Sequence, residues 1–309
     1  MSAAGRGAVL VFVLMAVSVP GLATARQISE SLKLVQQGRR LNQAGKQDEA
    51  LALYDRALVA DPNLFDAHLA RGIVLDLMGR YSDARTDLAR AIELATAENR
   101  ETALDAMAVS LAFESRADEA ARFLQKAFDA ASAERPGAAA EQANALGRLF
   151  LECGDTANAR RWYRTGYETA HRQPDEPGSQ LDLWEFRWLH AQARIAARER
   201  KADEARAKAE AARALMASAP SLADQGPTIA YLEGYLALYA GDAAGASMAL
   251  RRADQQDPFV LMLEARAADK IGDRAAAEHF WRLVLMVNSH SLQNAFARPA
   301  ARKALHEGK

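Results

Sequence analysis

The chain reads SLKLVQQGRRLNQAGKQDEALALYDRALVADPNL over residues 31–64, and a second copy of this pattern follows without insertion at residues 65–98. Glycine, leucine and alanine recur at matching positions of the two copies, always 34 residues apart. The matching pairs are Gly38 and Gly72, Leu41 and Leu75, Gly45 and Gly79, Ala50 and Ala84, and Ala57 and Ala91. A fixed period of this length indicates stacked supersecondary units that share a core, because one unit alone cannot bury its apolar face.

Each copy is expected to form two helices joined by a short turn. The first helix carries small and apolar residues at helical spacing and ends at Gly45, because glycine tolerates the left-handed conformation of a helix end. The second helix begins near Asp48 with an acidic first turn and ends before Pro62, which cannot continue a helix. Glycine and alanine are expected where the two backbones approach closely, and Tyr54 is expected to fill the wider gap beside them.

The same pattern of small and large residues continues to residue 286 with less regular spacing and gives five further copies. In the fifth copy, Arg200 stands in place of the turn glycine. The residues that carry the pattern are Leu104, Ala108, Leu111, Ala120, Leu124 and Ala127 in copy three; Leu146, Gly147, Phe150, Gly154, Ala159 and Tyr163 in copy four; Leu189, Ala193, Ala205 and Ala212 in copy five; Gly234, Gly241, Ala246, Leu250, Ala253 and Pro258 in copy six; and Leu261, Ala265, Gly272, Ala277 and Trp281 in copy seven.

This arrangement resembles the tetratricopeptide repeat (TPR) family over nearly all of the chain that follows residue 30. The resemblance implies an all-α fold, a TPR-like α-solenoid in which about seven helix-turn-helix repeats wind into a right-handed superhelix. It also implies that the first helix of each repeat lines a concave groove. The function is therefore expected to be binding.

The chain is expected to have five segments. Residues 171–182, HRQPDEPGSQLD, contain two prolines and a glycine and are predicted to form a loop or hinge between two stacks of repeats. Residues 291–309 follow the last repeat, and their helical part is expected to begin at Pro299 and to form a polar cap on the solenoid. The predicted segments are 1–25, signal peptide; 26–170, repeats one to four; 171–182, loop or hinge; 183–290, repeats five to seven; and 291–309, capping segment.

The first 25 residues have the features of a secretory signal peptide. Arg6 precedes an apolar run at residues 8–19, and small residues at Ala23 and Ala25 favour a cut after Ala25. The run is about 12 residues long, which is too short to span a bilayer comfortably. We therefore expect a periplasmic or secreted protein with no stable membrane span after cleavage. The alternative is an uncleaved N-terminal membrane anchor.

Composition and motifs argue against several classes of function. A formal net charge of −1 is not that of a general nucleic-acid binder. The single cysteine, Cys153, allows no internal disulfide and is expected to be a small buried residue. The six histidines show no metal-ligand spacing, and the sequence contains no nucleophile elbow, phosphate loop or dinucleotide fingerprint. We therefore expect no catalytic residue, no metal and no cofactor, and a protein that is not an enzyme.

A candidate binding surface lies on the first helices of repeats five and six. Four basic residues of repeat five share one helical face, and three tyrosines of repeat six do the same. Together with one arginine of repeat four, the surface comprises Arg148, Arg187, His190, Arg194, Arg198, Tyr231, Tyr235 and Tyr239. Guanidinium groups pair with carboxylates and tyrosines anchor interfaces, so this surface is predicted to bind a peptide or protein partner. The alternative is that the arginines are only solvated and the tyrosines only half-buried packing.

The sequence thus predicts an exported, non-enzymatic interaction scaffold. It would bind a peptide or protein partner in a helical groove and help to assemble or organise a cell-envelope complex. An accessory or regulatory subunit of an envelope enzyme is the first alternative, and a cryptic enzyme is a further one. Self-association through the exposed ends of the stack also stays open.

Overall fold

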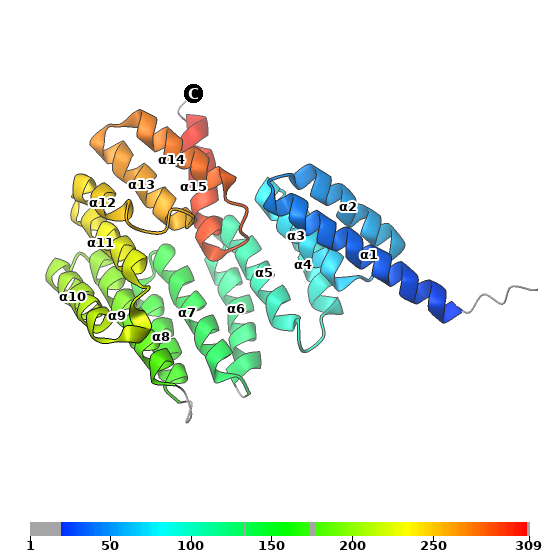
Figure 1. The fold of residues 1–309 in the computed structure, drawn as a ribbon, viewed down its shortest axis with the longest axis horizontal. Helices are drawn as coiled ribbons and strands as arrows, with labels where there is room; N and C mark the ends of the chain where they lie inside the picture. Colours follow the sequence, from blue (N-terminus) through cyan, green and yellow to red (C-terminus); the bar gives the residue numbers. More distant parts are fainter. Residues whose placement is uncertain (1–19, 133, 173–176, 308–309) are drawn as a thin grey trace, which may run out of the picture.

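The computed structural model describes residues 20–132, 134–172 and 177–307, and every regular element within these residues is helical (Figure 1). The predicted all-α fold class is therefore confirmed. The helices are α1 (Pro20–Gln43), α2 (Gln47–Ala60), α3 (Phe65–Met78), α4 (Tyr81–Leu94), α5 (Arg100–Phe113), α6 (Ala117–Ser132), α7 (Pro136–Glu152), α8 (Thr156–Ala170), α9 (Gly178–Arg198), α10 (Ala202–Ser218), the 3₁₀ turn η1 (Pro220–Leu222), α11 (Gly226–Ala240), α12 (Ala243–Leu250), α13 (Pro258–Ile271), α14 (Arg274–Met286) and α15 (Leu292–Glu307).

The helices α1–α14 form seven consecutive pairs, and each pair packs on the next (Figure 1). Within a pair, the odd-numbered helix packs on the even-numbered helix that follows it. Odd-numbered helices of several neighbouring pairs also contact one another: α1 with α3, α3 with α5, α9 with α11 and α11 with α13. The odd-numbered helices therefore form the inner, concave layer of the solenoid, as expected for the first helix of each repeat.

Small residues allow the two helices of a pair to approach closely. A Cβ atom added at Gly72 would lie 2.8 Å from the Leu88 side chain, and one at Gly147 would lie 2.7 Å from the Tyr163 ring. Real Cβ atoms do not come this close to other heavy atoms, so a methyl group at either position would force the helices apart. The expected pairing of a glycine with a large side chain on the facing helix is confirmed.

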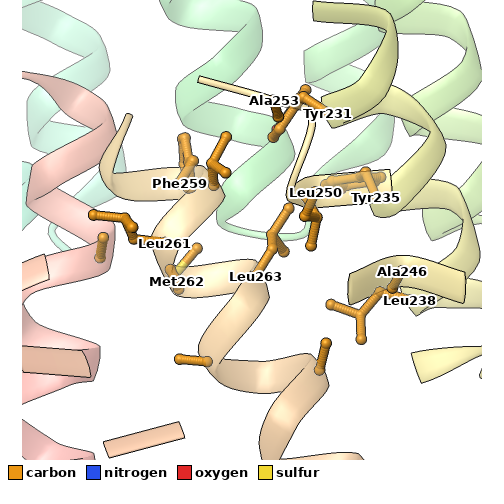
Figure 2. Packing of buried hydrophobic residues seen from close by; sticks show 14 of the residues in the cluster. Tyr231, Tyr235, Leu238, Ala246, Leu250, Ala253, Phe259, Leu261, Met262 and Leu263 are labelled. Carbon is orange, nitrogen blue, oxygen red and sulfur yellow. The ribbon is translucent and has the colours of Figure 1, made fainter. Parts of the chain in front are cut away.

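The largest buried clusters each extend over several helix pairs. The cluster at the C-terminal end includes Tyr231 and Tyr235 of α11, Leu250 of α12 and Leu263 of α13, and Figure 2 shows these side chains in contact range across three helices. A second cluster extends from α3 to α8 and also takes in Leu292 of α15. Neighbouring pairs thus share their core, which is how a solenoid compensates for the small core of one pair.

The predicted loop at residues 171–182 is too long at its C-terminal end. Residues 173–176 lie outside the described residues, and α9 begins at Gly178, so the last five positions of the predicted loop are helical. The helix extends this far because its first turns pack: Leu183 and Phe186 contact a buried cluster with Leu222 of η1. The hinge and the division into two stacks stay predictions.

The predicted start of the C-terminal helix at Pro299 is wrong. Helix α15 begins at Leu292 and contains Pro299 in its interior. The Ser291 hydroxyl accepts a hydrogen bond from the Asn294 amide at 3.3 Å and caps this earlier start. Ala295 is only 1% exposed, so burial of the first turns outweighs the poor helix propensity of an interior proline.

The N-terminal prediction concerns residues that are mostly outside the described part. The structure begins with Pro20 in α1, and the predicted cut after Ala25 falls within this helix. Cleavage and export stay predictions. None of the helices in the described residues has both the length and the hydropathy needed to cross a bilayer.

We expect Gly147→Ala to destabilise the solenoid. Overpacking costs about 1–3 kcal/mol, and the better helix propensity of alanine offsets about 1 kcal/mol of this. The net loss in the free energy of unfolding should reach about 2 kcal/mol, because the ring atoms next to Cβ of Tyr163 cannot move without moving α8. Urea unfolding followed by circular dichroism measures the change.

Gly178→Ala is the matched control for this substitution. Gly178 is exposed at the start of α9, and a Cβ atom there would meet no heavy atom within 4 Å. Its stability should therefore equal that of the wild type or exceed it slightly. An unchanged midpoint for Gly147→Ala would contradict the close-approach account.

Candidate binding groove

The eight residues predicted as a binding surface lie on three inner helices. Arg148 is on α7, the four basic residues of repeat five are on α9, and the three tyrosines are on α11. The structure brings seven of them together; Arg187 lies apart, in an ion pair with Glu141 at 2.6 Å. Whether any of the eight contacts a partner stays a prediction.

Four of the eight residues are buried, so the expectation that they line an exposed groove is wrong for these four. His190, Arg194, Tyr231 and Tyr235 are each between 2% and 7% exposed. They are covered because α9 and α11 pack directly against each other, so the faces that were expected to line the groove are turned toward one another. The His190 and Tyr231 rings stack, with centroids 5.6 Å apart. Tyr239 remains 37% exposed.

The buried residues form a polar cluster between α7, α8, α9 and α11. Arg194 donates a hydrogen bond to the Tyr163 hydroxyl at 2.9 Å. Arg198 donates to the Tyr235 hydroxyl at 2.7 Å and to the Glu152 carboxylate at 2.6 Å. Arg198, at the end of α9, thus links the end of α7 to α11.

The cluster carries surplus positive charge and unpaired polar atoms. Burial, with the nearby charges of Arg194 and Arg148, lowers the pKa of His190 well below its usual value, so the ring is neutral. Within the described residues, buried atoms that lack a hydrogen-bond partner include Nε and Nη1 of Arg194, Nε2 of His190 and the Tyr231 hydroxyl. Buried polar atoms of this kind usually bind water or an ion.

An open groove of about 720 Å³ adjoins this cluster at the C-terminal ends of α9, α11 and α13. Its charged lining residues are Arg198, Arg200, Arg266, Lys270 and Asp269. Four cations therefore face one carboxylate, a local net charge of +3 in a chain whose formal net charge is −1. Tyr239 also lines the groove, with its ring 5.0 Å from the Arg198 guanidinium carbon.

Three of these cations have no partner within the described part of the chain. No hydrogen bond or ion pair there joins the side chains of Arg200, Arg266 or Lys270 to another group, whereas Asp269 accepts from Trp281 at 3.3 Å. Arg200 occupies the turn after α9 with a φ of 60°, the left-handed conformation that Ser115 adopts after α5 and that glycine adopts in the corresponding turns of the other pairs. The groove thus presents unpaired donors to solvent, as an anion-binding surface requires.

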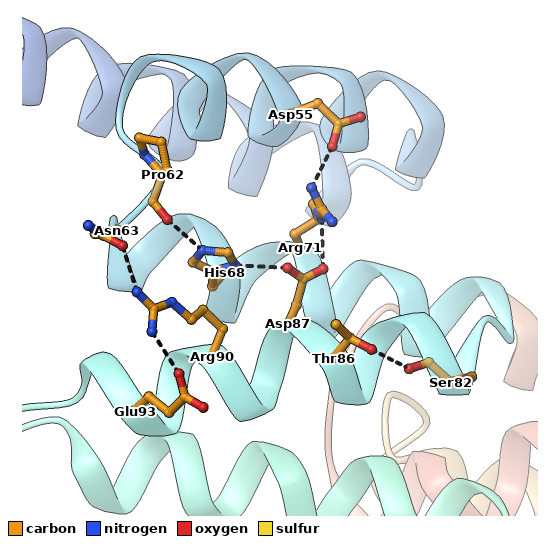
Figure 3. Close-up of polar contacts among 10 residues, drawn as sticks. All are labelled: Asp55, Pro62, Asn63, His68, Arg71, Ser82, Thr86, Asp87, Arg90 and Glu93. Atoms are coloured by element: carbon orange, nitrogen blue, oxygen red, sulfur yellow. Dashed lines mark hydrogen bonds and ion pairs between the residues drawn. The ribbon is translucent and has the colours of Figure 1, made fainter.

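A second hollow, of about 740 Å³, lies on the second repeat but is poorer in free charge. Its three arginines are Arg71, Arg85 and Arg90, and each already contacts a carboxylate. Figure 3 shows Asp87 held between His68, at 2.8 Å, and Arg71, at 2.7 Å. These groups satisfy one another, so the hollow has little to offer a charged ligand, and the groove between α9 and α13 is the better candidate.

Two further sequence predictions concern reactive groups. Cys153 is exposed at the end of α7, so the prediction of a small buried residue is wrong. It is exposed because α7 ends at Glu152 and the turn that follows faces solvent. In the described part of the chain no three His, Cys, Asp or Glu side chains are grouped as a metal site would need.

Sequence reasoning missed most of the residues that line the open groove. Of the predicted surface only Arg198 and Tyr239 line it, whereas Arg200, Arg266 and Lys270 were not singled out. The available signal was positional: each of these cations lies at or near the C-terminal end of an inner helix, where the helix dipole favours positive charge. That the ends of α9, α11 and α13 converge is a property of the superhelix.

We expect Glu152→Gln to cost about 3 kcal/mol of unfolding free energy, because it leaves the partly buried guanidinium group of Arg198 without its close carboxylate and removes a negative charge near the buried Arg194. Urea denaturation of the purified chain measures the loss.

The same two helices supply the control. Glu141 on α7 pairs with Arg187 on α9 at the same 2.6 Å, but both side chains are largely solvated. Glu141→Gln should therefore change the stability by no more than about 0.5 kcal/mol. Equal effects of the two substitutions would mean that burial of the Glu152 pair has no energetic consequence.

Comparison with known proteins agrees with the repeat architecture. A sequence model of the family described as TPR repeat matches residues 38–79. No curated protein shows significant sequence similarity to the chain.

Solved structures show the same fold at low sequence identity. A tetratricopeptide repeat protein from Parabacteroides merdae ATCC 43184 has a TM-score of 0.54 and 11% identity, covering 90% of this chain and 98% of that chain. The apo form of RapI has a TM-score of 0.58 and 12% identity, covering 90% and 100%. A Rap protein complexed with competence and sporulation factor has a TM-score of 0.53 and 17% identity, covering 91% and 77%. The chain therefore carries a tetratricopeptide repeat and folds as a TPR-like α-solenoid.

Proposed function

We propose that this protein is an exported, non-enzymatic scaffold that binds an acidic peptide segment of a partner protein in the groove between α9, α11 and α13. The partner segment presents carboxylates to Arg200, Arg266 and Lys270 and an apolar or aromatic side chain to Tyr239. By holding such a segment, the scaffold helps to assemble or organise a complex of the cell envelope.

The observation that carries the proposal is the unpaired charge of the groove. Its three free cations lie around a concave surface of about 720 Å³, which is enough for several side chains of an extended segment. Carboxylates are the natural counter-ions, because a guanidinium binds them with two parallel hydrogen bonds. The overall charge of −1 is not that of a general nucleic-acid binder, which favours an acidic peptide over a nucleic acid.

The rigid scaffold also favours binding. The helices that carry the groove are packed before a ligand arrives, so little conformational entropy is lost when a segment binds. A Rap protein of similar fold has been solved in complex with competence and sporulation factor, which supports a partner-binding role for this kind of solenoid. The inference for this chain rests on its own groove.

We expect the double variant Arg266→Ala, Lys270→Ala to bind acidic peptides more weakly by about tenfold or more, because charged hydrogen bonds contribute about 1.5–3 kcal/mol each before solvent screening reduces them. The probe is a set of fluorescein-labelled peptides with several aspartates or glutamates, measured by fluorescence anisotropy at two salt concentrations. The variant should also show a weaker dependence on salt.

Arg90→Ala is the control for this experiment, because Arg90 lines the hollow of the second repeat and is paired with Glu93. Its peptide affinity should match that of the wild type. Equal loss in both variants would show that binding depends on overall charge, and the absence of binding to any acidic peptide would remove the proposed function.

Export makes a separate prediction that does not involve the groove. The N-terminal sequence supports cleavage after Ala25, so expression of the full chain in a bacterium should yield an envelope or secreted product that begins at Arg26. Cell fractionation and N-terminal sequencing measure both features. A product that keeps residues 1–25 and stays with the membrane would support the N-terminal anchor instead.

A further inference from the structure

The C-terminal helix α15 lies in the concave face of the solenoid. It packs on α13 and α14, which precede it, and also on α5 and α7, which belong to the third and fourth repeats (Figure 1). Leu292 and Ala295 belong to the buried cluster of α3–α8, and Phe296 contacts both that cluster and the C-terminal one. The helix therefore occupies a groove that the earlier repeats have built.

The groove offers a buried negative charge to this segment. Asp76, at the end of α3, is fully buried and has two side-chain partners, Ser110 at 2.8 Å and His290 at 2.9 Å. His290 lies just before α15, so the segment that leads into this helix supplies one of the two hydrogen-bond partners. A buried carboxylate is costly without such a partner, so the groove requires a donor from whatever occupies it.

The groove also offers unpaired carbonyl groups of a helix end. The Leu77 carbonyl, in the last turn of α3, accepts hydrogen bonds from Arg298 at 3.0 Å and from Arg302 at 2.9 Å. Carbonyls in the last turn have no partner within the helix, and the helix dipole favours cations there. Two arginines of α15, one helical turn apart, thus supply donors that α3 lacks.

Three features reduce the stability of the docked α15. Residues 287–291, which connect it to α14, are not helical. Pro299 removes a backbone hydrogen bond from its interior. Arg298 is buried against carbonyl groups without a carboxylate, and this burial lowers its pKa to about 10. Undocking would return both arginines to water, which reduces the net free energy that docking provides.

We propose that the groove of α3, α5 and α7 is a helix-binding site that α15 occupies in cis, and that a basic amphipathic helix of a partner protein displaces α15 from it. The partner helix carries an apolar face that replaces Leu292, Ala295 and Phe296. It also carries two cations at the spacing of Arg298 and Arg302. This site is separate from the basic groove of α9–α13 and takes a partner of opposite charge.

The test weakens the docking of α15 and leaves the groove unchanged. The full chain with Arg298→Ala and Arg302→Ala is titrated into a fluorescein-labelled peptide of residues 288–309 with the wild-type sequence. The variant should bind this peptide more tightly than the wild-type chain by about tenfold or more, because the apparent Kd falls as the fraction of open groove rises. Circular dichroism and thermal unfolding establish that the variant is folded.

Arg282→Ala is the matched control, because Arg282 is exposed on α14 and pairs only with Glu278 of its own helix. It should bind the peptide as the wild type does. A folded double variant that does not gain affinity would overturn the proposal. A wild-type chain that forms dimers at the concentrations used would mean that a second copy supplies the helix, which would overturn the assignment to a different partner.

Hydrogen exchange on the wild-type chain gives a second test that needs no variant. If α15 is displaceable, its amides should exchange through an opening that leaves α5 and α13 protected. Equal protection of α15, α5 and α13 would mean that the helix opens only on global unfolding, and this would also overturn the proposal.

Discussion

The structure depends on the close approach of two helices within each repeat, because this contact sets the angle at which every pair meets the next. Gly72 and Gly147 allow it by leaving room for Leu88 and Tyr163 on the facing helices. A single pair buries too little to be stable, so the free energy of folding comes from the core that neighbouring pairs share. The curvature of the inner layer, and therefore both grooves, follows from this repeated contact.

A cluster of polar groups lies inside the helical stack where repeats four to six meet. Arg194 donates a hydrogen bond to the Tyr163 hydroxyl, and Arg198 donates to the Tyr235 hydroxyl and to the Glu152 carboxylate. The buried cluster and the open groove next to it share Arg198, so the charge that attracts a ligand is fixed in place by the packing beneath it. A loop-borne site would have to order its side chains when the ligand binds.

A solenoid normally has contacts only between neighbouring repeats, and α15 departs from this rule. His290 and Asp76 are 214 residues apart in the chain, yet their side chains are 2.9 Å apart. This contact joins the last repeat to the second one and makes the stability of the two ends interdependent. The same segment covers apolar and polar surface of α3 and α5 that would otherwise face the concave opening.

The sequence by itself determined the helix pairs, their approximate number and several of the turns between them. The 34-residue period places Gly38 and Gly72 in equivalent positions, and turn residues such as Gly45 and Pro62 mark helix ends. These features are local, because helix periodicity and the backbone preferences of glycine and proline act over a few residues. The start of α9 and of α15 was misjudged since packing against distant helices extended both.

Only the tertiary structure decided which polar side chains face solvent and which are buried. Helical spacing correctly placed Arg194 and Tyr235 on the faces of α9 and α11 that lie near each other, but it contained no information on the distance between the two helices. The winding of the superhelix over several repeats decides two features: that Arg200, Arg266 and Lys270 line one groove, and that α15 packs against α5. That winding is the sum of many small packing angles between neighbours, and no local pattern in the sequence encodes it.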